Sequence, residues 1–176
     1  MIFLYYSTVD GQTKRIAEKI ESVLKENGER VTIKEIEEKT VTDDYTFSGN
    51  DKVILLASIR YGFFPKKVYR FVEKARLANV SCESYFIGVN LIARNVEKQS
   101  VENNVYVRKF LEKITWQPTK VKIFAGALNY TKYNFFDKKM IQLIMKITNG
   151  PTDASVDTDF TDWASVKEFA ESLIAE

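Results

Sequence analysis

The sequence alternates short apolar runs with amphipathic patterns of helical period, and this alternation restricts the fold more than any other feature. Residues 1–6 (MIFLYY) and 52–57 (KVILLA) are apolar almost throughout, which is typical of strands buried on both faces. Between them, Ile16, Ile20 and Leu24 fall on one face of a helical pattern. Strands buried on both faces require helices on both sides of their sheet, so the chain is predicted to form a layered α/β fold.

Five strands and four helices are predicted outside residues 129–159. The strands cover residues 1–6, 31–36, 52–57, 84–89 and 121–128, and the helices cover residues 12–27, 65–77, 100–115 and 162–174. Strands that alternate with helices form parallel sheets. For 176 residues we expect one domain, residues 1–176, with a flavodoxin-like or Rossmann-like doubly wound sheet. Ligands of such sheets bind beyond the carboxyl ends of the strands, where the strand order reverses.

Residues 129–159 interrupt the alternation, because a connection of this length is unusual between a strand and a helix. We predict an insertion after the fifth strand, with a helix of its own. Apolar side chains cover most of that helix, and Lys138, Gln142 and Lys146 form a narrow polar stripe. The helix is too short to span a bilayer but can lie in its interface. This favours a peripheral membrane contact through residues 134–148; a helix docked on the sheet, or a contact between copies in a homo-oligomer, is the alternative.

The composition argues against several kinds of chemistry. The chain has no histidine, so it lacks the commonest general base and the commonest metal ligand, and no metal site is predicted. Its one cysteine, Cys82, is expected to be a structural thiol. Without a signal peptide or a run of ~18 apolar residues, a cytoplasmic protein is expected. A net charge of +2 is too small to favour nucleic acid as a partner.

The first predicted strand leads into a helix through a turn of small and hydroxylated residues. Unpaired amides at a helix N-terminus favour an anion such as a phosphate monoester. Gly11 would let the backbone approach it, whereas the carboxylate of Asp10 would repel it and is expected to bond amides of the turn instead. The turn has no lysine, which suits a phosphate that is bound and never transferred. The alternative is a turn that only caps the helix.

Two further turns follow predicted strands at the same edge of the sheet. Residues 58–65 (SIRYGFFP) contain a glycine and three aromatic residues, and residues 90–94 (NLIAR) begin with an asparagine. Facing loops of this kind can enclose a planar ring, with Tyr61 on its face and Asn90 at its polar edge. A phosphate-bearing tail and a flat ring together indicate FMN. The alternative is that the aromatic residues only cover the end of the sheet.

Eight segments resemble one family in particular, in order along almost the whole chain. They are YYSTVDGQT, ASIRYG, VNLIAR, YVRKFL, W-x-P, AGALNY, KKMIQLIMK and TDW. Together they resemble the oxygen-independent, menaquinone-dependent protoporphyrinogen IX dehydrogenases, which are long-chain flavodoxin-like enzymes. The resemblance implies a flavodoxin-like doubly wound five-stranded parallel sheet with a helical insertion after the fifth strand. It also implies FMN, six-electron oxidation of protoporphyrinogen IX in haem biosynthesis, and transfer of the electrons to menaquinone or ubiquinone at the inner face of the cell membrane.

The resemblance also assigns cofactor-binding residues. The phosphate would be held by Ser7, Thr8, Asp10, Gly11, Gln12 and Thr13; the ring would be flanked by Ser58, Ile59, Arg60, Tyr61, Gly62, Asn90, Leu91, Ala93 and Arg94, with Tyr130 at its border. Asp10 departs from the T-x-T-G-x-T of ordinary flavodoxins, where a threonine is expected. No catalytic base can be carried over from the family.

Arg60 and Arg94 are the candidates for a direct role in the reaction. Either guanidinium could pair with a substrate propionate or with the charge of the reduced flavin; the alternative is that both are solvated loop residues. Three other functions stay open: a flavodoxin-type electron carrier, an FMN-dependent quinone reductase supplied by a nicotinamide, and a flavodoxin-like scaffold without cofactor. Electron carriers usually have an acidic face, and a chain with a net charge of +2 has no net excess of acidic residues.

Overall fold

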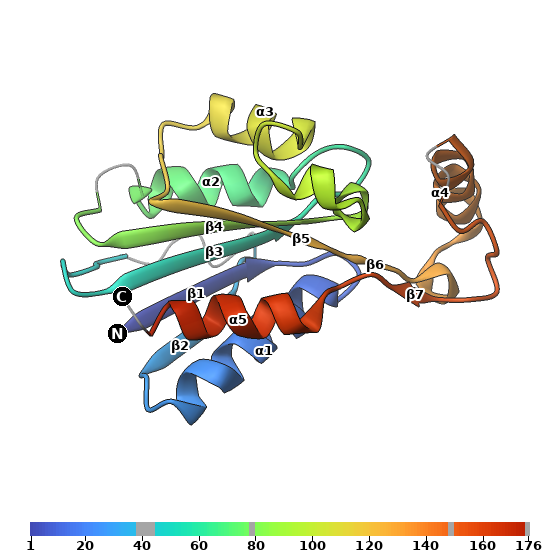
Figure 1. The fold of residues 1–176 in the computed structure, drawn as a ribbon. Coiled ribbons are helices and arrows are strands. Elements are labelled where there is room, and N and C mark those ends of the chain that lie inside the picture. Colours follow the sequence, from blue (N-terminus) through green and yellow to red (C-terminus); the bar gives the residue numbers. More distant parts are fainter. Residues whose placement is uncertain (38–44, 78–79, 148–149, 175–176) are drawn as a thin grey trace.

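The centre of the molecule is a five-stranded sheet in the order β2-β1-β3-β4-β5, with every neighbouring pair parallel (Figure 1). The structure is a computed structural model that describes residues 1–37, 45–77, 80–147 and 150–174. The strands are β1 (Ile2–Ser7), β2 (Val31–Glu35), β3 (Lys52–Ser58), β4 (Glu83–Asn90) and β5 (Lys120–Ala125). The predicted doubly wound parallel sheet is confirmed, and the strand order reverses between β1 and β3.

Two layers of helices cover the sheet (Figure 1). One face is covered by α1 (Gln12–Glu26) and α5 (Trp163–Ser172), and the other by α2 (Lys66–Lys74) and α3 (Val105–Lys113). Successive side chains of a strand point to opposite faces. In β3, therefore, Ile54 packs in the cluster beneath α1 and α5, while Val53 and Leu55 pack in the cluster beneath α2 and α3. This explains why the sequence of β3 is apolar at every central position.

Among the predicted elements whose bounds differ in the structure, two differ for a clear local reason. The helix predicted from residue 100 begins at Val105, because the Asn104 side chain caps it by accepting a hydrogen bond from Val107 N at 3.3 Å. The strand predicted over residues 121–128 breaks at Gly126, where the chain leaves the sheet. The next two residues form β6 (Ala127–Leu128), which pairs antiparallel with β7 (Thr158–Asp159). Short 3₁₀ helices, not predicted, complete the connections: η2 (Leu91–Arg94), η3 (Val96–Gln99) and η4 (Tyr130–Lys132).

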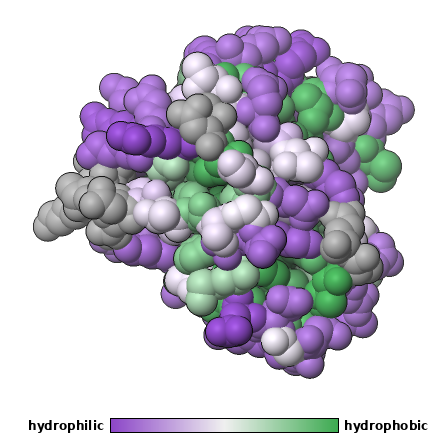
Figure 2. Space-filling view, turned by 90° about the vertical axis from the view of Figure 1, so that its left-hand side faces the viewer, coloured by the Kyte–Doolittle hydropathy of each residue, from purple (hydrophilic) through white to green (hydrophobic). Residues whose placement is uncertain are grey.

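Helix α4 (Phe135–Ile147) lies away from the sheet, beyond the carboxyl ends of the strands (Figure 1). Its inner side, Ile141 and Met145, packs in a small cluster with Leu128, Tyr130 and Tyr133. Its outer side is exposed. The opposite end of the molecule, where the strands begin, presents mainly hydrophilic side chains around a paler centre (Figure 2). In the described part of the chain, no helix has the length and apolar character that a membrane crossing requires.

Candidate functional site

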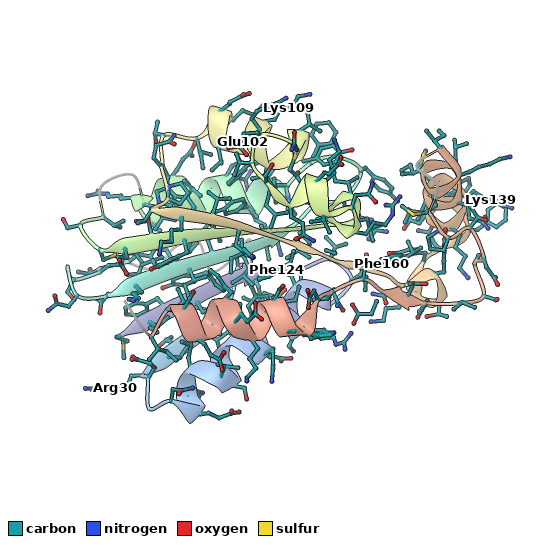
Figure 3. All side chains as sticks on the ribbon, viewed as in Figure 1. Arg30, Glu102, Lys109, Phe124, Lys139 and Phe160 are labelled. Atoms are coloured by element: carbon teal, nitrogen blue, oxygen red, sulfur yellow. The ribbon has the colours of Figure 1, made fainter. Side chains whose placement is uncertain are left out.

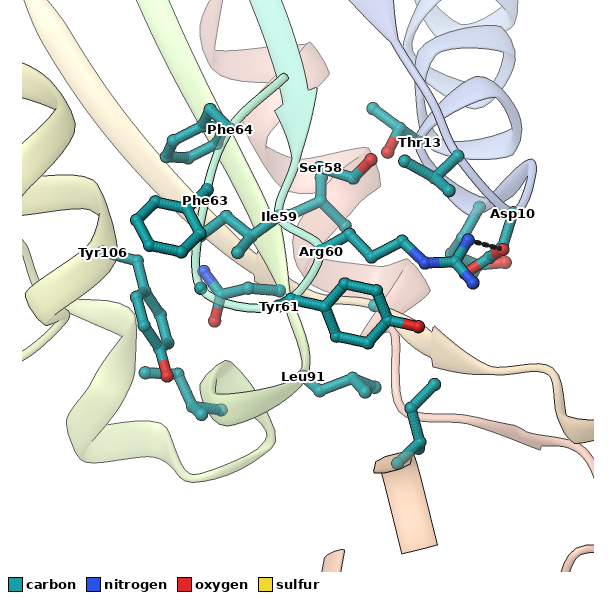
Figure 4. Close-up of a pocket in the computed structure, with 18 of the residues that line it drawn as sticks. Asp10, Thr13, Ser58, Ile59, Arg60, Tyr61, Phe63, Phe64, Leu91 and Tyr106 are labelled. Atoms are coloured by element: carbon teal, nitrogen blue, oxygen red, sulfur yellow. Dashed lines mark hydrogen bonds and ion pairs between the residues drawn. The ribbon is translucent and has the colours of Figure 1, made fainter. Parts of the chain in front are cut away.

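A cavity of about 690 Å³ opens at the carboxyl edge of the sheet (Figure 4). The turns that follow β1, β3 and β4 contribute to its wall, together with side chains from α3 and α4. It therefore lies where the strand order reverses, the place predicted for a ligand. Its volume is within the ordinary range for a site that holds a small molecule or cofactor.

The turn after β1 is flanked by two buried hydroxyl groups without a hydrogen-bond partner in the described structure. Gly11 has a φ of +89°, and its amide donates to Thr8 Oγ1 at 3.0 Å, so the turn closes on itself. Behind it, Ser7 Oγ and Thr13 Oγ1 are fully buried and bond to nothing in the described structure. Buried polar groups are normally paired. A ligand with acceptor oxygens would satisfy both hydroxyls, so these residues fit the phosphate of FMN.

Asp10 is held by side chains from elsewhere in the chain. Its Oδ1 lies 3.2 Å from Arg60 Nη1, and its Oδ2 accepts a hydrogen bond from the Tyr133 hydroxyl at 3.2 Å. Lys132 Nζ donates to the Asp10 carbonyl, also at 3.2 Å. The prediction that the carboxylate bonds amides of its own turn is therefore wrong. Arg60 offsets the charge of Asp10, which reduces its repulsion of a neighbouring phosphate.

Gln12 connects the same turn to the far end of the 129–159 segment. Its Nε2 donates to Asp159 Oδ1 at 2.8 Å and to Thr161 Oγ1 at 2.7 Å. Arg15 reaches Asp159 as well, with Nη1 3.2 Å from Oδ2. The side-chain amide of Gln12 thus serves the packing of β7 against α1.

The turn after β3 is a tight hairpin. Arg60 and Phe63 exchange two backbone hydrogen bonds of 3.1 Å, and the two residues between them have positive φ, +52° for Tyr61 and +87° for Gly62. This is the geometry of a type I′ turn. Positive φ is unfavourable for a tyrosine and is tolerated mainly where the surroundings hold it in place. The Tyr61 ring is half exposed at the cavity.

Asp137 of α4 binds both polar groups of this hairpin. Its carboxylate accepts a hydrogen bond from the Tyr61 hydroxyl. Its Oδ2 also forms an ion pair with Arg60, at 2.5 Å from Nη2. Burial, together with the hydrogen bond to Asp137, raises the pKa of Tyr61 above its ordinary value. Arg60 also contacts Asp10, as Figure 4 shows, so one guanidinium joins the first turn, the β3 hairpin and α4.

Asn90 organises the turn after β4. Its Oδ1 accepts hydrogen bonds from Ala93 N at 3.1 Å and from Asn104 Nδ2 at 3.3 Å, while its own Nδ2 is buried without a partner in the described structure. This donor is available to a ligand. Arg94 points elsewhere, because its Nη1 donates to the Leu91 carbonyl at 3.1 Å.

Most residues predicted for the site line the cavity: Thr8, Asp10, Gln12, Thr13, Ser58, Ile59, Arg60, Tyr61, Gly62, Asn90 and Leu91. The others lie outside its lining: Ser7, Gly11, Ala93, Arg94 and Tyr130. Ser7 ends β1 and Gly11 lies in the turn that follows it, whereas Tyr130 is fully buried beneath α4 and donates to the Pro151 carbonyl.

Sequence reasoning missed the contribution of α3. Tyr106, Lys109 and Lys113 line the cavity from this helix. Their spacing of three and then four residues places them on one side of a helix, so the sequence could have predicted a shared polar side here. The prediction for this helix considered only its apolar residues, which face the core.

Comparison with known proteins identifies the family. A family model described as a flavodoxin domain matches residues 3–155. The chain belongs to the flavodoxin family. The chain is 40% identical over 173 residues to a protein of Leishmania major named protoporphyrinogen IX dehydrogenase [quinone]. The matched region covers 98% of this chain and 74% of the relative. A protein of Escherichia coli K12 with the same name is 38% identical over 170 residues, covering 97% of the chain and 92% of the relative.

Solved structures agree with the flavodoxin fold. The chain is similar to oxidised flavodoxin 1 from Bacillus cereus, with a TM-score of 0.54, 13% identity, and coverage of 99% of this chain and 97% of the other. A flavodoxin from Streptococcus pneumonia TIGR4 gives a TM-score of 0.51, 15% identity, and coverage of 99% and 97%. The predicted resemblance to the quinone-linked dehydrogenases is therefore confirmed, and membership of the flavodoxin family supports FMN as the cofactor.

Proposed function

We propose that this flavodoxin-family oxidoreductase uses FMN to oxidise protoporphyrinogen IX to protoporphyrin IX, a step of haem biosynthesis, and passes the electrons to menaquinone or ubiquinone. The observation that carries the proposal is a cavity whose wall combines a turn with buried hydroxyl groups and an apolar helix, α4. The relatives at 38–40% identity carry the name of this activity. An electron carrier does not need an enclosed apolar wall beside its cofactor.

In this proposal the first turn binds the phosphate of FMN and the two following turns hold its ring. Ser7 and Thr13 donate their hydroxyls, and the amides at the start of α1 supply further donors. Tyr61 covers one face of the ring, and Asn90 Nδ2 donates to its polar edge. FMN, when bound, supplies the two-electron acceptor, so the protein has to position the substrate and exclude water.

Helix α4 provides the apolar surface for the substrate. Phe136, Met140 and Ile144 of this helix line the cavity. A porphyrinogen has a large apolar body, and burying it against these side chains removes apolar area from water. The ion pair of Arg60 with Asp137 fixes α4 against the hairpin, which keeps this wall in place.

We also propose that the outer side of α4 rests on the inner face of the cell membrane. Phe135, Leu143 and Ile147 are 69%, 55% and 73% exposed and do not line the cavity. Exposed apolar groups beside lysines, such as Lys139, are typical of helices that lie in a membrane interface. The predicted contact covered residues 134–148, of which residue 148 lies outside the described residues.

An anaerobic assay tests the proposed function. Purified protein with FMN bound is mixed with protoporphyrinogen IX and a water-soluble quinone, and porphyrin fluorescence is followed against a control without protein. We expect fluorescence to rise well above the control, with about three quinone molecules reduced for each porphyrin, because the oxidation removes six electrons. Fluorescence equal to the control, with FMN confirmed by absorbance, would contradict the proposal and favour an electron carrier.

A further inference from the structure

Two lysines on α3 line the cavity and have no partner of opposite charge among the described residues. Lys109 and Lys113 are one helical turn apart, and both contribute to the cavity wall (Lys109 is labelled in Figure 3). In the described part of the chain, no carboxylate lies within ion-pair distance of either ammonium group. The acidic residue nearest in sequence, Glu112, faces Arg108 at 3.9 Å instead.

The arginines expected to meet a substrate carboxylate are already engaged. Arg60 contacts both Asp10 and Asp137, so its charge is more than balanced within the protein. Arg94 does not line the cavity, and its guanidinium donates to the Leu91 carbonyl. A substrate carboxylate would therefore have to displace an existing pair to reach Arg60, whereas the lysines of α3 are available.

The cavity consequently has an uneven distribution of charge. At the side of the first turn and α4 there are two carboxylates, Asp10 and Asp137, and one guanidinium, Arg60. At the side of α3 there are two ammonium groups, Lys109 and Lys113. The β3 hairpin lies between the two sides (Figure 4). A ligand with carboxylates along one edge would be bound with that edge toward α3.

We infer that Lys109 and Lys113 form the carboxylate-binding end of the substrate site. This inference rests on the proposed function and names the residues that orient its substrate. Protoporphyrinogen IX carries its two propionates on neighbouring pyrroles, so both project from one edge of the macrocycle. With that edge at α3, the vinyl-bearing edge points toward the apolar side chains of α4, such as Met140. Each ammonium group then pairs with one propionate.

The test compares the free diacid of protoporphyrinogen IX with its dimethyl ester. The ester keeps the apolar body and removes both negative charges. In the FMN-loaded Lys109→Gln/Lys113→Gln variant, we expect the KM for the diacid to rise about tenfold, with kcat little changed. The KM for the ester should stay at the wild-type value. Higher salt should raise the wild-type KM for the diacid and not that for the ester.

A matched control removes two lysines from the neighbouring helix. Lys66→Gln/Lys74→Gln changes the net charge equally, but neither residue lines the cavity, so both substrates should retain wild-type constants. An unchanged KM for the diacid in the α3 variant, or an equal loss with diacid and ester, would overturn the inference while the proposed function stands. If the FMN-loaded wild-type protein oxidises neither substrate, the proposed function fails and this inference fails with it.

Discussion

Arg60 Nη1 lies 3.2 Å from Asp10 Oδ1, and this contact joins two turns that are fifty residues apart in the sequence. The same guanidinium contacts Asp137, so α4 is connected to the first turn through a single side chain. Ion pairs at partly exposed positions contribute little to stability on their own. Here the arrangement matters more for the site, because it places a cation between two carboxylates at the edge of the proposed phosphate turn.

Replacing Arg60 by methionine should weaken binding of FMN. The variant leaves Asp10 and Asp137 unbalanced near the phosphate, so we expect the Kd for FMN to rise about tenfold, with a stronger salt dependence. Riboflavin, which lacks the phosphate, should lose much less affinity. Fluorescence titration at two ionic strengths measures both. Arg94→Met, outside the cavity lining, serves as the comparison and should leave both ligands bound as in wild type; equal losses for FMN and riboflavin in Arg60→Met would refute this explanation.

Replacing Thr13 by valine should separate phosphate binding from folding. The substitution removes a buried hydroxyl that has no partner in the described structure, so the apo protein should be as stable as wild type or slightly more stable. We expect the Kd for FMN to rise about tenfold and that for riboflavin to change less than about twofold. Thr32→Val, at an exposed position on β2, is the control. An unaltered FMN affinity would mean that Thr13 does not contact the phosphate.

Replacing Gly62 by alanine should destabilise the β3 hairpin. Gly62 has a φ of +87°, and an added Cβ would meet Tyr106 Cε1 at 3.2 Å. We expect a loss of about 1–2 kcal/mol in the free energy of unfolding, or a Tm lower by about 3–6 °C. Gly49→Ala is the matched control, because no atom of the described residues lies within 4 Å of its added Cβ and its φ is not positive. Equal melting curves for the two variants, measured by circular dichroism, would show that the hairpin relaxes.

Removing apolar side chains from the outer side of α4 should release the protein from membranes. We expect the Phe135→Ser/Leu143→Ser/Ile147→Ser variant to lose most of its co-sedimentation with anionic vesicles, while turnover with a water-soluble quinone is retained. Val96→Ser/Val156→Ser removes exposed apolar groups elsewhere and should sediment like wild type. Wild-type protein that stays in the supernatant would exclude the membrane contact.

Stability should fall in alkaline solution partly because of Tyr133. Burial, with the nearby carboxylate of Asp10, raises the pKa of Tyr133 to about 12 from 10.0. The folded state therefore keeps a proton that the unfolded state loses first. The resulting stabilisation is complete below about pH 10 and disappears as the pH rises through about 12. At pH 11 the loss should be about 1 kcal/mol.

Urea denaturation of Tyr133→Phe checks this assignment. The variant has no titrating hydroxyl at this position, so its stability should decline less than that of wild type between pH 8 and 11. Tyr6, whose pKa is also raised to about 12 by burial and by Glu35, titrates in both proteins and accounts for a shared decline. Parallel pH profiles for the two proteins would show that Tyr133 ionises normally.

The parallel arrangement of the sheet was predictable because each strand is marked by a local pattern, whereas the choice of a flavodoxin-like over a Rossmann-like sheet rested on the family resemblance. The apolar residues of β1 and β3 fill both faces of the sheet, and their spacing in the chain requires parallel crossovers. The position of the cavity at the carboxyl edge of the sheet followed from topology alone. The break at Gly126 was not predictable, because residues 127–128 satisfy the strand pattern equally well when they pair with β7.

Contacts between distant segments account for what the sequence could not reveal about the site. The position of Arg60 in the cavity was predicted, but its partners, Asp10 and Asp137, come from a turn and a helix whose relative placement only folding determines. The side-chain direction of Asn90 likewise depends on Asn104, fourteen residues away. Local periodicity describes which face of an element is buried and contains no information on such pairs.

The ladder between β6 and β7 is only two residues long, Ala127 with Asp159 and Leu128 with Thr158. The chain that leaves the sheet after β5 therefore returns within one strand spacing, about 5 Å, of its point of departure. The two ends of the 129–157 stretch therefore lie side by side. A short hairpin turn between Leu128 and Thr158 could replace the whole stretch and still connect β5 to α5. Because the two junctions are neighbours, this stretch adds one side of the cavity without altering the pairing of the central strands.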